Sequence, residues 1–385
     1  MGMSLLLALI CLGAVAGGAA LLLLGVRRLP LLTAVRPPPG PLPTVSVVIA
    51  ARDEAAHIAA TVRALLAAAT PGLEVVVVDD RSGDGTWGAL EGLAVDPRLR
   101  RIRLDRLPPG WLGKNHALAR GAAAARGEWL LFMDADVRLE PGALPRALAE
   151  AGRQRLDHLA VFPSLEARGL VLRLMLLQFA MSFLAWFRPW RLPEDRRAYV
   201  GVGAFNLVRA AAYRRAGGHA AFALSPLDDM MLGRVVARAG GRSAAALSGG
   251  LVRLAWYPSA GEMIRHFEKN AFAAFGFRLT RLVALTAVIA LLGLWPWLGL
   301  ALATGLERAL HAATVAVTVL VHGVLARGSG WPVWIGLASP LGTLAMLWLW
   351  WRGSLLACWR GAVRWRGTTY PLAALRAHHD RLMRD

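Results

Sequence analysis

Between residues 45 and 137, short apolar runs alternate with helical stretches, and the runs end abruptly in acidic residues. Strands that alternate with helices form a mostly parallel sheet, in which ligands bind at the carboxyl ends of the strands. The fold class is therefore α/β. The pattern predicts strands at 45–50, 73–78, 100–104 and 129–133, and helices at 55–69 and 118–125.

The run 129–133 is followed by two aspartates, Asp134 and Asp136, separated by one residue. Two like charges at a strand end require solvent or a cation between them. Carboxylate oxygens suit a hard divalent ion such as Mg²⁺ or Mn²⁺, usually completed by substrate phosphates. Acidic pairs also occur by chance at strand ends, so the prediction of a metal site depends on the other motifs in the sequence.

The two earlier strands also end in pairs of acidic residues. Asp53 and Glu54 follow the first strand, and Asp79 and Asp80 follow the second, before a Ser/Gly-rich turn. Carboxylates there can accept hydrogen bonds from base N–H and ribose hydroxyl groups, and the turn offers backbone N–H groups to phosphate. The same stretch also fits a capped turn that starts a helix, with Asp84 or Thr86 as the cap.

The composition indicates membrane segments, because 56% of the residues are hydrophobic and the mean hydropathy is +0.46. The net charge of +19 comes without a nucleic-acid-binding motif. We therefore expect the arginines to meet anionic lipid and expect no nucleic-acid partner. Cys11 and Cys358 lie in or beside apolar runs, so they imply no disulfide framework and fit a reducing, cytoplasmic active domain.

Of the 44 basic residues only Lys114 and Lys269 are lysines. A general preference for arginine explains most of this bias. The two lysines are then candidates for positions that need a compact ammonium rather than a planar guanidinium. Chance is the alternative explanation.

Residues 1–28 are expected to form a transmembrane anchor, since the apolar run 4–26 precedes Arg27 and Arg28. Basic residues at that end place the following domain in the cytoplasm. Residues 29–44 read as a stiff, proline-rich linker.

Leu170–Phe187 has the length of a membrane span, but Arg173 and Gln178 interrupt it. A crossing there would place Asp136 and Asp229 on opposite faces of the membrane. We interpret it as an interfacial helix, and the amphipathic stretch 262–277 in the same way.

The block 279–360 contains apolar segments near 282–303, 309–326 and 331–351, and residues 361–385 form a basic tail. Four spans in all would leave that tail outside, against the positive-inside trend. One segment is therefore a candidate re-entrant element, broken at Pro296 or Pro340.

The ordered motifs VSVVIAARDE, VVVVDDRSGDGT, GWLGKNHALARG and LLFMDADV resemble the nucleotide-sugar-binding half of family 2 glycosyltransferases of the GT-A fold. Within that family, membrane-anchored enzymes that glycosylate carotenoid-type or other isoprenoid lipids are the most similar group. The resemblance implies a Rossmann-like catalytic domain over residues 45–278, and extends weakly to Val363–Gly367.

The resemblance also implies roles for these residues. Asp79 and Asp80 would contact the base and ribose of a UDP- or GDP-sugar, beside Asp53 and Glu54. Asp134 and Asp136 would hold the divalent ion, with Asp134 also on the donor. Lys114, expected just before a helix, would reach the phosphates, or be only an exposed loop lysine.

In the second half, Asp228 and Asp229 stand where the family has a Glu-Asp pair. An inverting transfer needs a base for the acceptor hydroxyl, and Asp229 is the candidate. Either aspartate could instead be the N-cap of the helix that runs to Ala239. Gly201–Asn206 and Gly217–His219 are expected to shape the acceptor side, with a direct role for His219 disfavoured.

Processive family members carry a Gln-x-x-Arg-Trp motif, and neither Gln154 nor Gln178 begins one. This favours transfer of a single sugar to a lipid, at the cytoplasmic face of a bacterial inner membrane. A polysaccharide synthase and a catalytically idle nucleotide-binding scaffold are the alternatives.

Lys269 is expected to be a snorkelling interfacial lysine. We expect His311 and His322 to form a polar seam between spans.

Overall fold

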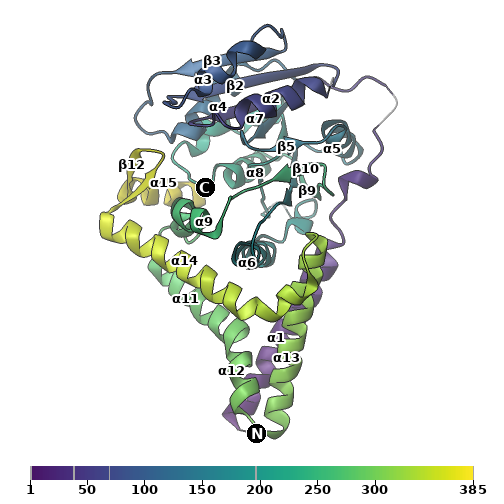
Figure 1. Cartoon of the computed structure of the whole chain (residues 1–385), viewed down its shortest axis with the longest axis vertical. Coiled ribbons are helices and arrows are strands. Elements are labelled where there is room, and N and C mark those ends of the chain that lie inside the picture. Colours follow the sequence, from purple (N-terminus) through teal and green to yellow (C-terminus); the bar gives the residue numbers. More distant parts are fainter. Residues whose placement is uncertain (1, 38–39, 69, 196, 385) are drawn as a thin grey trace. The chain divides into compact units, whose positions relative to one another are not determined.

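The computed structural model describes residues 2–37, 40–68, 70–195 and 197–384. The chain divides into two compact units, which are treated separately below. The first, called the α/β unit, contains Arg28–Glu166 and Pro189–Trp256. The second, called the helical unit, contains Met1–Arg27, Ala167–Arg188 and Tyr257–Asp385. Figure 1 labels the elements of both.

The α/β unit is built on a mostly parallel sheet, as expected. Within the described residues it has seven strands in the order β3-β2-β1-β4-β8-β6-β9, and only β8 runs antiparallel to its neighbours. These strands are β1 (Val45–Ala51), β2 (Leu73–Asp80), β3 (Leu99–Leu104), β4 (Trp129–Met133), β6 (His158–Phe162), β8 (Asn206–Arg209) and β9 (Ser243–Leu247). Chain order reverses between β1 and β4, which is where open α/β sheets bind ligands.

Alternation along the strands assigns each side chain to one face of the sheet. Val47 and Ile49 of β1 enter the main core with apolar side chains of α2 (Ile58–Ala67) and α5 (Ala143–Arg153). Val48 points the other way, toward α4 (Gly113–Ala124). The sheet is therefore covered by helices on both faces, and β1 is buried except at the partly buried Ala50.

Shorter elements complete this unit. They are η1 (Leu32–Ala34), α3 (Thr86–Ala89), η2 (Glu91–Leu93), β5 (Arg138–Leu139), β7 (Ser164–Leu165), η3 (Pro189–Arg191), α7 (Ala210–Arg215), η4 (Gly218–Phe222), α8 (Asp228–Arg238) and β10 (Val252–Leu254). The strands β5, β10 and β7 form a small separate sheet.

The segment 29–44 differs from the separate linker expected from its prolines. Leu32 is fully buried in the core, and Leu31 forms a parallel bridge with Leu247 at the end of β9. The backbone N–H of Leu247 donates to the carbonyl of Pro30 over 2.9 Å. Residues 30–34 thus belong to the α/β unit because their leucines enter its core, whereas Pro38 and Pro39 lie outside the described residues.

The helical unit gathers the long apolar helices. It contains α1 (Met3–Val26), α6 (Leu170–Phe187), α9 (Ala260–His266), α10 (Glu268–Ala273), α11 (Leu279–Ile289), the π-helical turn η5 (Ala290–Leu294), α12 (Trp295–Leu302), α13 (Gly305–Gly328), η6 (Val333–Ala338), α14 (Ser339–Arg360), β11 (Ala362–Trp365), β12 (Thr368–Pro371) and α15 (Leu372–Arg384). Helix α13 packs against α1 and α12, and Figure 1 shows the three side by side.

This grouping differs from the expected domain boundaries. The stretch 45–278 was expected to be one domain, but α6, α9 and α10 belong to the helical unit. The reason is their apolar surface, since α6 and α10 both pack against α14. The basic tail is also more structured than expected, with β11 and β12 paired as a hairpin before α15.

By length and composition, the described chain has five helical stretches that could cross a membrane. They are Met3–Val26, Leu170–Arg191, Leu279–Leu302, Gly305–Gly328 and Val333–Arg360. Both prolines proposed as breaks stand where the helical geometry changes. Pro296 lies in the first turn of α12, after the π-helical turn, and Pro340 in the first turn of α14, after a 3-10 turn.

Close packing of α4 on the sheet gives a stability prediction. A Cβ at Gly121 would lie 2.4 Å from Cγ1 of Val48, so Gly121→Ala overpacks the helix–sheet contact despite its better helix propensity. We expect a loss of about 1–2 kcal/mol in the free energy of unfolding. Thermal denaturation of the detergent-solubilised chain measures it. Gly152→Ala in α5, where nothing lies within 4 Å, is the control and should be neutral or stabilising.

Candidate active site

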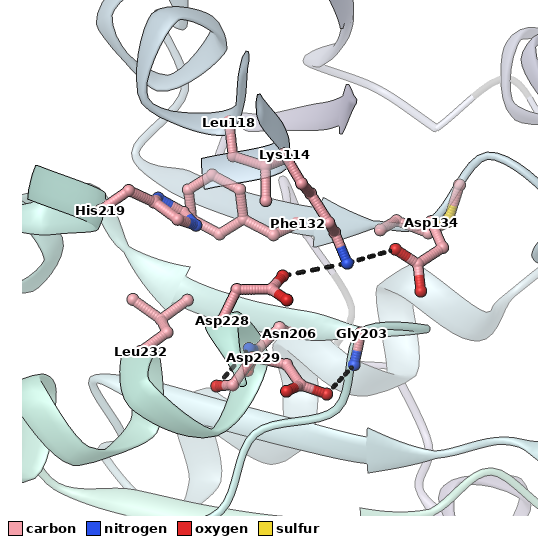
Figure 2. Close-up of a pocket in the computed structure, with 11 residues that line it drawn as sticks. Lys114, Leu118, Phe132, Asp134, Gly203, Asn206, His219, Asp228, Asp229 and Leu232 are labelled. Atoms are coloured by element: carbon pink, nitrogen blue, oxygen red, sulfur yellow. Dashed lines mark hydrogen bonds and ion pairs between the residues drawn. The ribbon is translucent and has the colours of Figure 1, made fainter. Parts of the chain in front are cut away.

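One pocket of the α/β unit lies between the carboxyl end of β4 and the start of α8 (Figure 2). Asp134, directly after β4, donates its backbone N–H to the carbonyl of Gly203 over 3.1 Å. The N–H of Gly203 donates to Oδ2 of Asp229 over 3.0 Å. A Cβ at residue 203 would lie 2.8 Å from Oδ2 of Asp134, so a larger residue there would push the Asp134 carboxylate aside. The backbone of Gly203 therefore joins the two acidic motifs.

Lys114 lies between the carboxylates of those motifs. Its Nζ is 2.7 Å from Oδ1 of Asp134 and 2.9 Å from Oδ2 of Asp228, as Figure 2 shows. Burial alone would lower the pKa of Lys114, but the charges of Asp134, Asp228 and Asp229 outweigh it and raise the pKa above its usual value. The ammonium group thus stays charged and holds together carboxylates that would otherwise repel one another.

The helix that carries Lys114 begins earlier than expected. Helix α4 starts at Gly113 rather than near residue 118, so Lys114 stands in its first turn and not in a loop before it. Asn115, which the sequence reasoning missed, fixes this turn. Its buried side-chain amide donates to the carbonyls of Phe222, Ala223 and Ser225, just before α8. One feature of the sequence indicated its importance, namely that Asn115 directly follows Lys114, one of only two lysines.

Asp228 and Asp229 are the first two residues of α8, and neither is the N-cap. That position belongs to Leu227, which makes no side-chain cap, so the capping alternative is wrong. Oδ1 of Asp229 accepts from the N–H of Met230, and Asn206 donates to the backbone carbonyl of Asp229. Burial, followed by the charge of Asp228, raises the pKa of Asp229 to about 6. A carboxylate with such a pKa is suited to act as a base near neutral pH.

Asp136 is largely buried and lies near other carboxylates of this edge. Burial, then the charges of Asp134 and Glu54, raises its pKa to about 7. No group of three or more His, Cys, Asp or Glu side chains forms a metal cage within the part of the chain that the structure describes. Two carboxylates that lack a third protein ligand and repel each other suit a divalent ion that is completed by substrate phosphates. The residues present therefore fit such an ion.

His219 lines the same pocket but carries no charge. It is buried, with its ring against Phe132, and burial lowers its pKa to about 3. The hydroxyl of Tyr213 accepts from the N–H of His219 at 3.1 Å and contacts Nδ1 at 2.8 Å. The hydroxyl and Nδ1 share one hydrogen bond, and its direction depends on the tautomer of the histidine. Tyr213, missed in the sequence, thus holds the ring of His219 in place.

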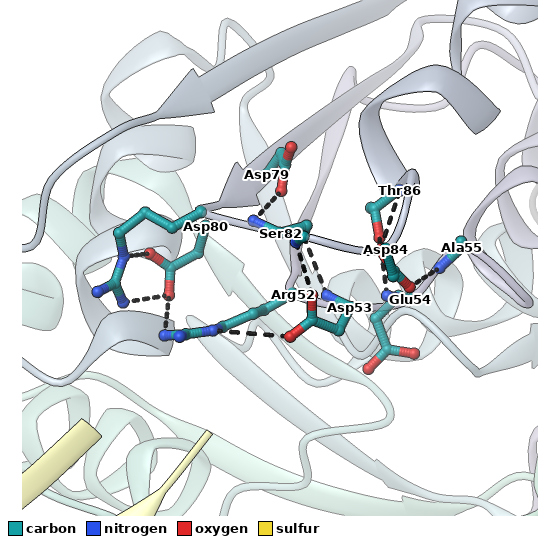
Figure 3. A network of polar contacts seen from close by, with 11 residues as sticks. Arg52, Asp53, Glu54, Ala55, Asp79, Asp80, Ser82, Asp84 and Thr86 are labelled. Atoms are coloured by element: carbon teal, nitrogen blue, oxygen red, sulfur yellow. Dashed lines mark hydrogen bonds and ion pairs between the residues drawn. The ribbon is translucent and has the colours of Figure 1, made fainter. Parts of the chain in front are cut away.

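A second cluster joins the loops after β1 and β2 (Figure 3). Asp53 accepts from the N–H of Gly83, and the N–H of Asp53 donates to Ser82. The N–H of Glu54 donates to Thr86 over 2.8 Å. These bonds bring the two acidic pairs to one edge of the sheet, as predicted.

The two aspartates at the end of β2 lie inside the strand and are buried. Arg81 binds both oxygens of Asp80, at 2.8 and 3.1 Å. Oδ1 of Asp79 accepts from the N–H of Ser82, whereas Oδ2 is buried without a hydrogen-bond donor in the described structure. Arg103 is 4.0 Å from that oxygen. Oδ2 of Asp79 is therefore a buried carboxylate oxygen with a cation nearby but no hydrogen-bond donor among the described residues.

The turn after these aspartates is capped, in agreement with the second of the two sequence interpretations. Asp84 accepts from the N–H and the hydroxyl of Thr86, and also from the N–H of Ala55. It therefore caps the turn into α3, although the N-cap position itself belongs to Gly85. The capped turn and the joining of the two loops use the same carboxylate.

Comparison with known proteins assigns this part of the chain. The family model described as "Glycosyl transferase family 2" matches residues 46–215. The chain carries a family 2 glycosyltransferase domain. The match contains β1, β2 and β4 together with Lys114 and Asp134, and it ends before Asp228.

Two curated relatives are similar over this domain. The succinoglycan biosynthesis protein ExoO of Rhizobium meliloti is 39% identical over 133 residues, which are 34% of this chain and 36% of the relative. The putative teichuronic acid biosynthesis glycosyltransferase TuaG of Bacillus subtilis is 30% identical over 107 residues, 28% of this chain and 41% of the relative. The chain thus matches only about two fifths or less of either relative's length.

Among solved structures, the mannosyltransferase PcManGT from Pyrobaculum calidifontis, in complex with GDP-Man and Mn²⁺, has a similar fold. The TM-score is 0.55 at 19% identity, with 92% of this chain and 98% of the other covered. The similarity supports the GT-A fold of the family 2 glycosyltransferase domain.

The pKa of Asp136 predicts how stability depends on pH. Its folded pKa of about 7 lies above that of an exposed aspartate, so the folded chain holds a proton that the unfolded chain releases. Without metal, stability should therefore fall as pH rises from about 4 to 7. Asp136→Asn should raise the melting temperature at pH 8 and not at pH 4, with exposed Asp105→Asn as the charge control. If Asp136→Asn and the wild type had the same melting temperature at pH 8, the raised pKa of Asp136 would be contradicted.

Proposed function

We propose that the chain transfers a single sugar from a nucleotide-sugar donor to a membrane lipid, with inversion at the anomeric carbon. The observation that carries the proposal is Lys114, placed between Asp134 of the donor motif and Asp228 of the second acidic motif. Lys114, Asp134 and Asp229, the proposed phosphate-binding cation, metal ligand and base, all line one pocket, which supports the proposal.

The donor is proposed to bind at the carboxyl edge of β1, β2 and β4. Asp79 supports this because Oδ2 is a buried acceptor without a donor, as a base N–H or ribose hydroxyl requires. The proposed donor site at this edge also includes the side chains of Asp53, Glu54 and Asp80. The mannosyltransferase with the similar fold binds GDP-Man, which supports a UDP- or GDP-sugar here.

Asp134 and Asp136 are proposed to hold Mg²⁺ or Mn²⁺. The ion would neutralise charge on the departing diphosphate. Lys114 can supply a second positive charge to the same phosphates, because its ammonium group is already within 2.7 Å of Asp134. Movement of Lys114 to phosphate would also free the Asp228 carboxylate.

Asp229 is proposed to accept the proton of the acceptor hydroxyl. The N–H groups of Gly203 and Met230 orient its carboxylate, and its raised pKa makes it a stronger base than an exposed aspartate. Asp228, paired with Lys114, keeps a negative charge beside it. His219 is neutral, and its ring can hydrogen-bond to a hydroxyl or phosphate in the pocket.

The acceptor is proposed to be a lipid, of the carotenoid or isoprenoid type or another, reached at the cytoplasmic face of a bacterial inner membrane. The long apolar helices of the same chain support a membrane location. The missing Gln-x-x-Arg-Trp motif supports one transfer rather than polymerisation.

A saccharide acceptor is the second candidate. It is favoured by the two curated relatives, which are named for succinoglycan and teichuronic acid biosynthesis. Mass spectrometry of lipid extracts from a deletion strain separates the candidates. Loss of one glycolipid supports a lipid acceptor, whereas loss of a polysaccharide with unchanged glycolipids supports a saccharide.

The proposed base gives a prediction for activity. Asp229→Asn should lower the transfer rate at least about 100-fold, while donor binding measured by calorimetry stays close to the wild type. Since the base must be deprotonated, wild-type transfer should fall as pH drops below about 6. Asp195→Asn, outside the pocket, is the control. An Asp229→Asn variant that binds donor and transfers normally would contradict the assignment, and a wild type that binds donor without turnover would indicate an idle scaffold.

A further inference from the structure

Contacts inside the helical unit limit which of its apolar helices can cross a membrane. This inference rests on the membrane attachment proposed above and not on the transfer reaction. We propose that Val333–Arg360 is a re-entrant segment that enters and leaves on the side of the α/β unit. Residues 361–384 then lie on that same side, and the membrane is crossed by Met3–Val26, Leu279–Leu302 and Gly305–Gly328.

Leu170–Arg191 is excluded as a span by strand pairing. Strand β4 precedes this segment in the chain and β8 follows it, yet the two strands pair, with Leu130 opposite Val208. A helix whose two ends lead into one sheet cannot separate those ends by a bilayer. Helix α6 therefore stays on the side of the α/β unit.

The chain between the α/β unit and α11 also stays on that side. Helices α9 and α10 have 7 and 6 residues, which together make about 20 Å of helix, less than the roughly 30 Å of a hydrocarbon core. Leu279–Leu302, with 24 residues and a mean hydropathy of 2.0, is the first stretch after Trp256 that is long enough to cross.

The C-terminal part of the chain is tied to this near-side segment. Arg278 forms an ion pair with Asp380 over 3.0 Å, and Arg376 donates to the carbonyl of Phe277 over 2.8 Å. Lys269 lies over the ring of Trp365 at 3.8 Å. Because residues 269–278 are on the near side, residues 365–380 are too. The chain from 279 to 360 must therefore cross an even number of times, although it contains three stretches of sufficient length.

Of the three stretches between residues 279 and 360, the last one, Val333–Arg360, is the one that does not cross. After α13 the chain turns back, since a Cβ at Gly336 would lie 2.4 Å from the carbonyl of Val319. His322 of α13 and Thr343 of α14 both contact Oε1 of Gln178, at 3.4 and 3.2 Å. His322 stands six residues before the end of α13, about 9 Å along its axis. The start of α14 is therefore near the same membrane face as the end of α13.

The other end of α14 returns to the near side. A Cβ at Gly353 would lie 2.8 Å from Cβ of Ala271, and Arg360 pairs with Glu268 over 2.7 Å. Both ends of α14 thus contact near-side helices, α6 at one end and α10 at the other. Figure 1 shows α14 at a steep angle to α13. Helix α14 is long enough to cross, so its contacts and not its length exclude a crossing.

One face of α14 remains for lipid. Its exposed large apolar side chains fall within about 60° around the helix at 3.6 residues per turn. They are Leu341, Leu344, Trp348, Leu355 and Trp359. The opposite face packs on α6 and α10. A single apolar stripe on a helix whose ends lie on one side suits acyl chains of the near leaflet.

The arrangement agrees with the distribution of arginines. Arg27, Arg278 and Arg327 stand at the near ends of the three spans, and the C-terminal residues add further arginines on that side. The far end of α13 has Glu307 and Arg308 in its first turns, and their charges cancel. Three crossings therefore satisfy the positive-inside rule that four would violate.

Single cysteines test the sidedness in a background with Cys11→Ala and Cys358→Ala. Whole cells are treated with a membrane-impermeant maleimide before and after permeabilisation. We expect Thr304→Cys to be labelled in intact cells. Ser329→Cys and Arg384→Cys should be labelled only after permeabilisation.

A crossing α14 predicts that Ser329→Cys and Arg384→Cys label from opposite sides, and this result would overturn the inference. Release of the protein by alkaline carbonate would overturn the membrane attachment itself. If the three cysteines are labelled as expected but the protein transfers no sugar, only the proposed function is contradicted. Leaflet-specific quenching of a fluorophore at Leu341→Cys and Leu355→Cys gives a second test, since both should be quenched from the near leaflet.

Discussion

The ion-pair group around Lys114 is the interaction on which the active site depends. Asp134 belongs to the first half of the domain and Asp228 to the second, and neither carboxylate could lie so near the other without the ammonium group. Asn115 holds the backbone of the same helical turn to the segment that leads into α8. The position of Lys114 therefore depends on both halves, and so does the distance between the two acidic motifs.

The sheet explains why these residues meet. Parallel strands β1, β2 and β4 end at one edge, and chain order reverses between β1 and β4. Loops at such an edge need no regular backbone pairing, so they can present carboxylates and N–H groups to a ligand. The buried strands supply rigidity, while the hydrogen bonds between the loops after β1 and β2 limit their freedom.

The sequence was sufficient to predict β1 to β4, the mostly parallel sheet and the acidic residues at its edge, whereas β6, β8 and β9 were not predicted. Those features depend on local periodicity and on where apolar runs end. It could not predict that Asn115 reaches residues 222–225 or that Tyr213 orients His219, because such contacts depend on tertiary packing. The start of α4 was also misplaced, since Gly113 and Asn115 are poor helix formers that tertiary contacts hold in the helix.

Gly203 joins the two acidic motifs of the pocket through both of its backbone polar groups, which belong to adjacent peptide units. Its carbonyl accepts from the backbone N–H of Asp134, and its own N–H donates to the carboxylate of Asp229. A shift of this residue would therefore displace both motifs together. A side chain at this position would press on the Asp134 carboxylate, so a larger residue would change the spacing between the two motifs.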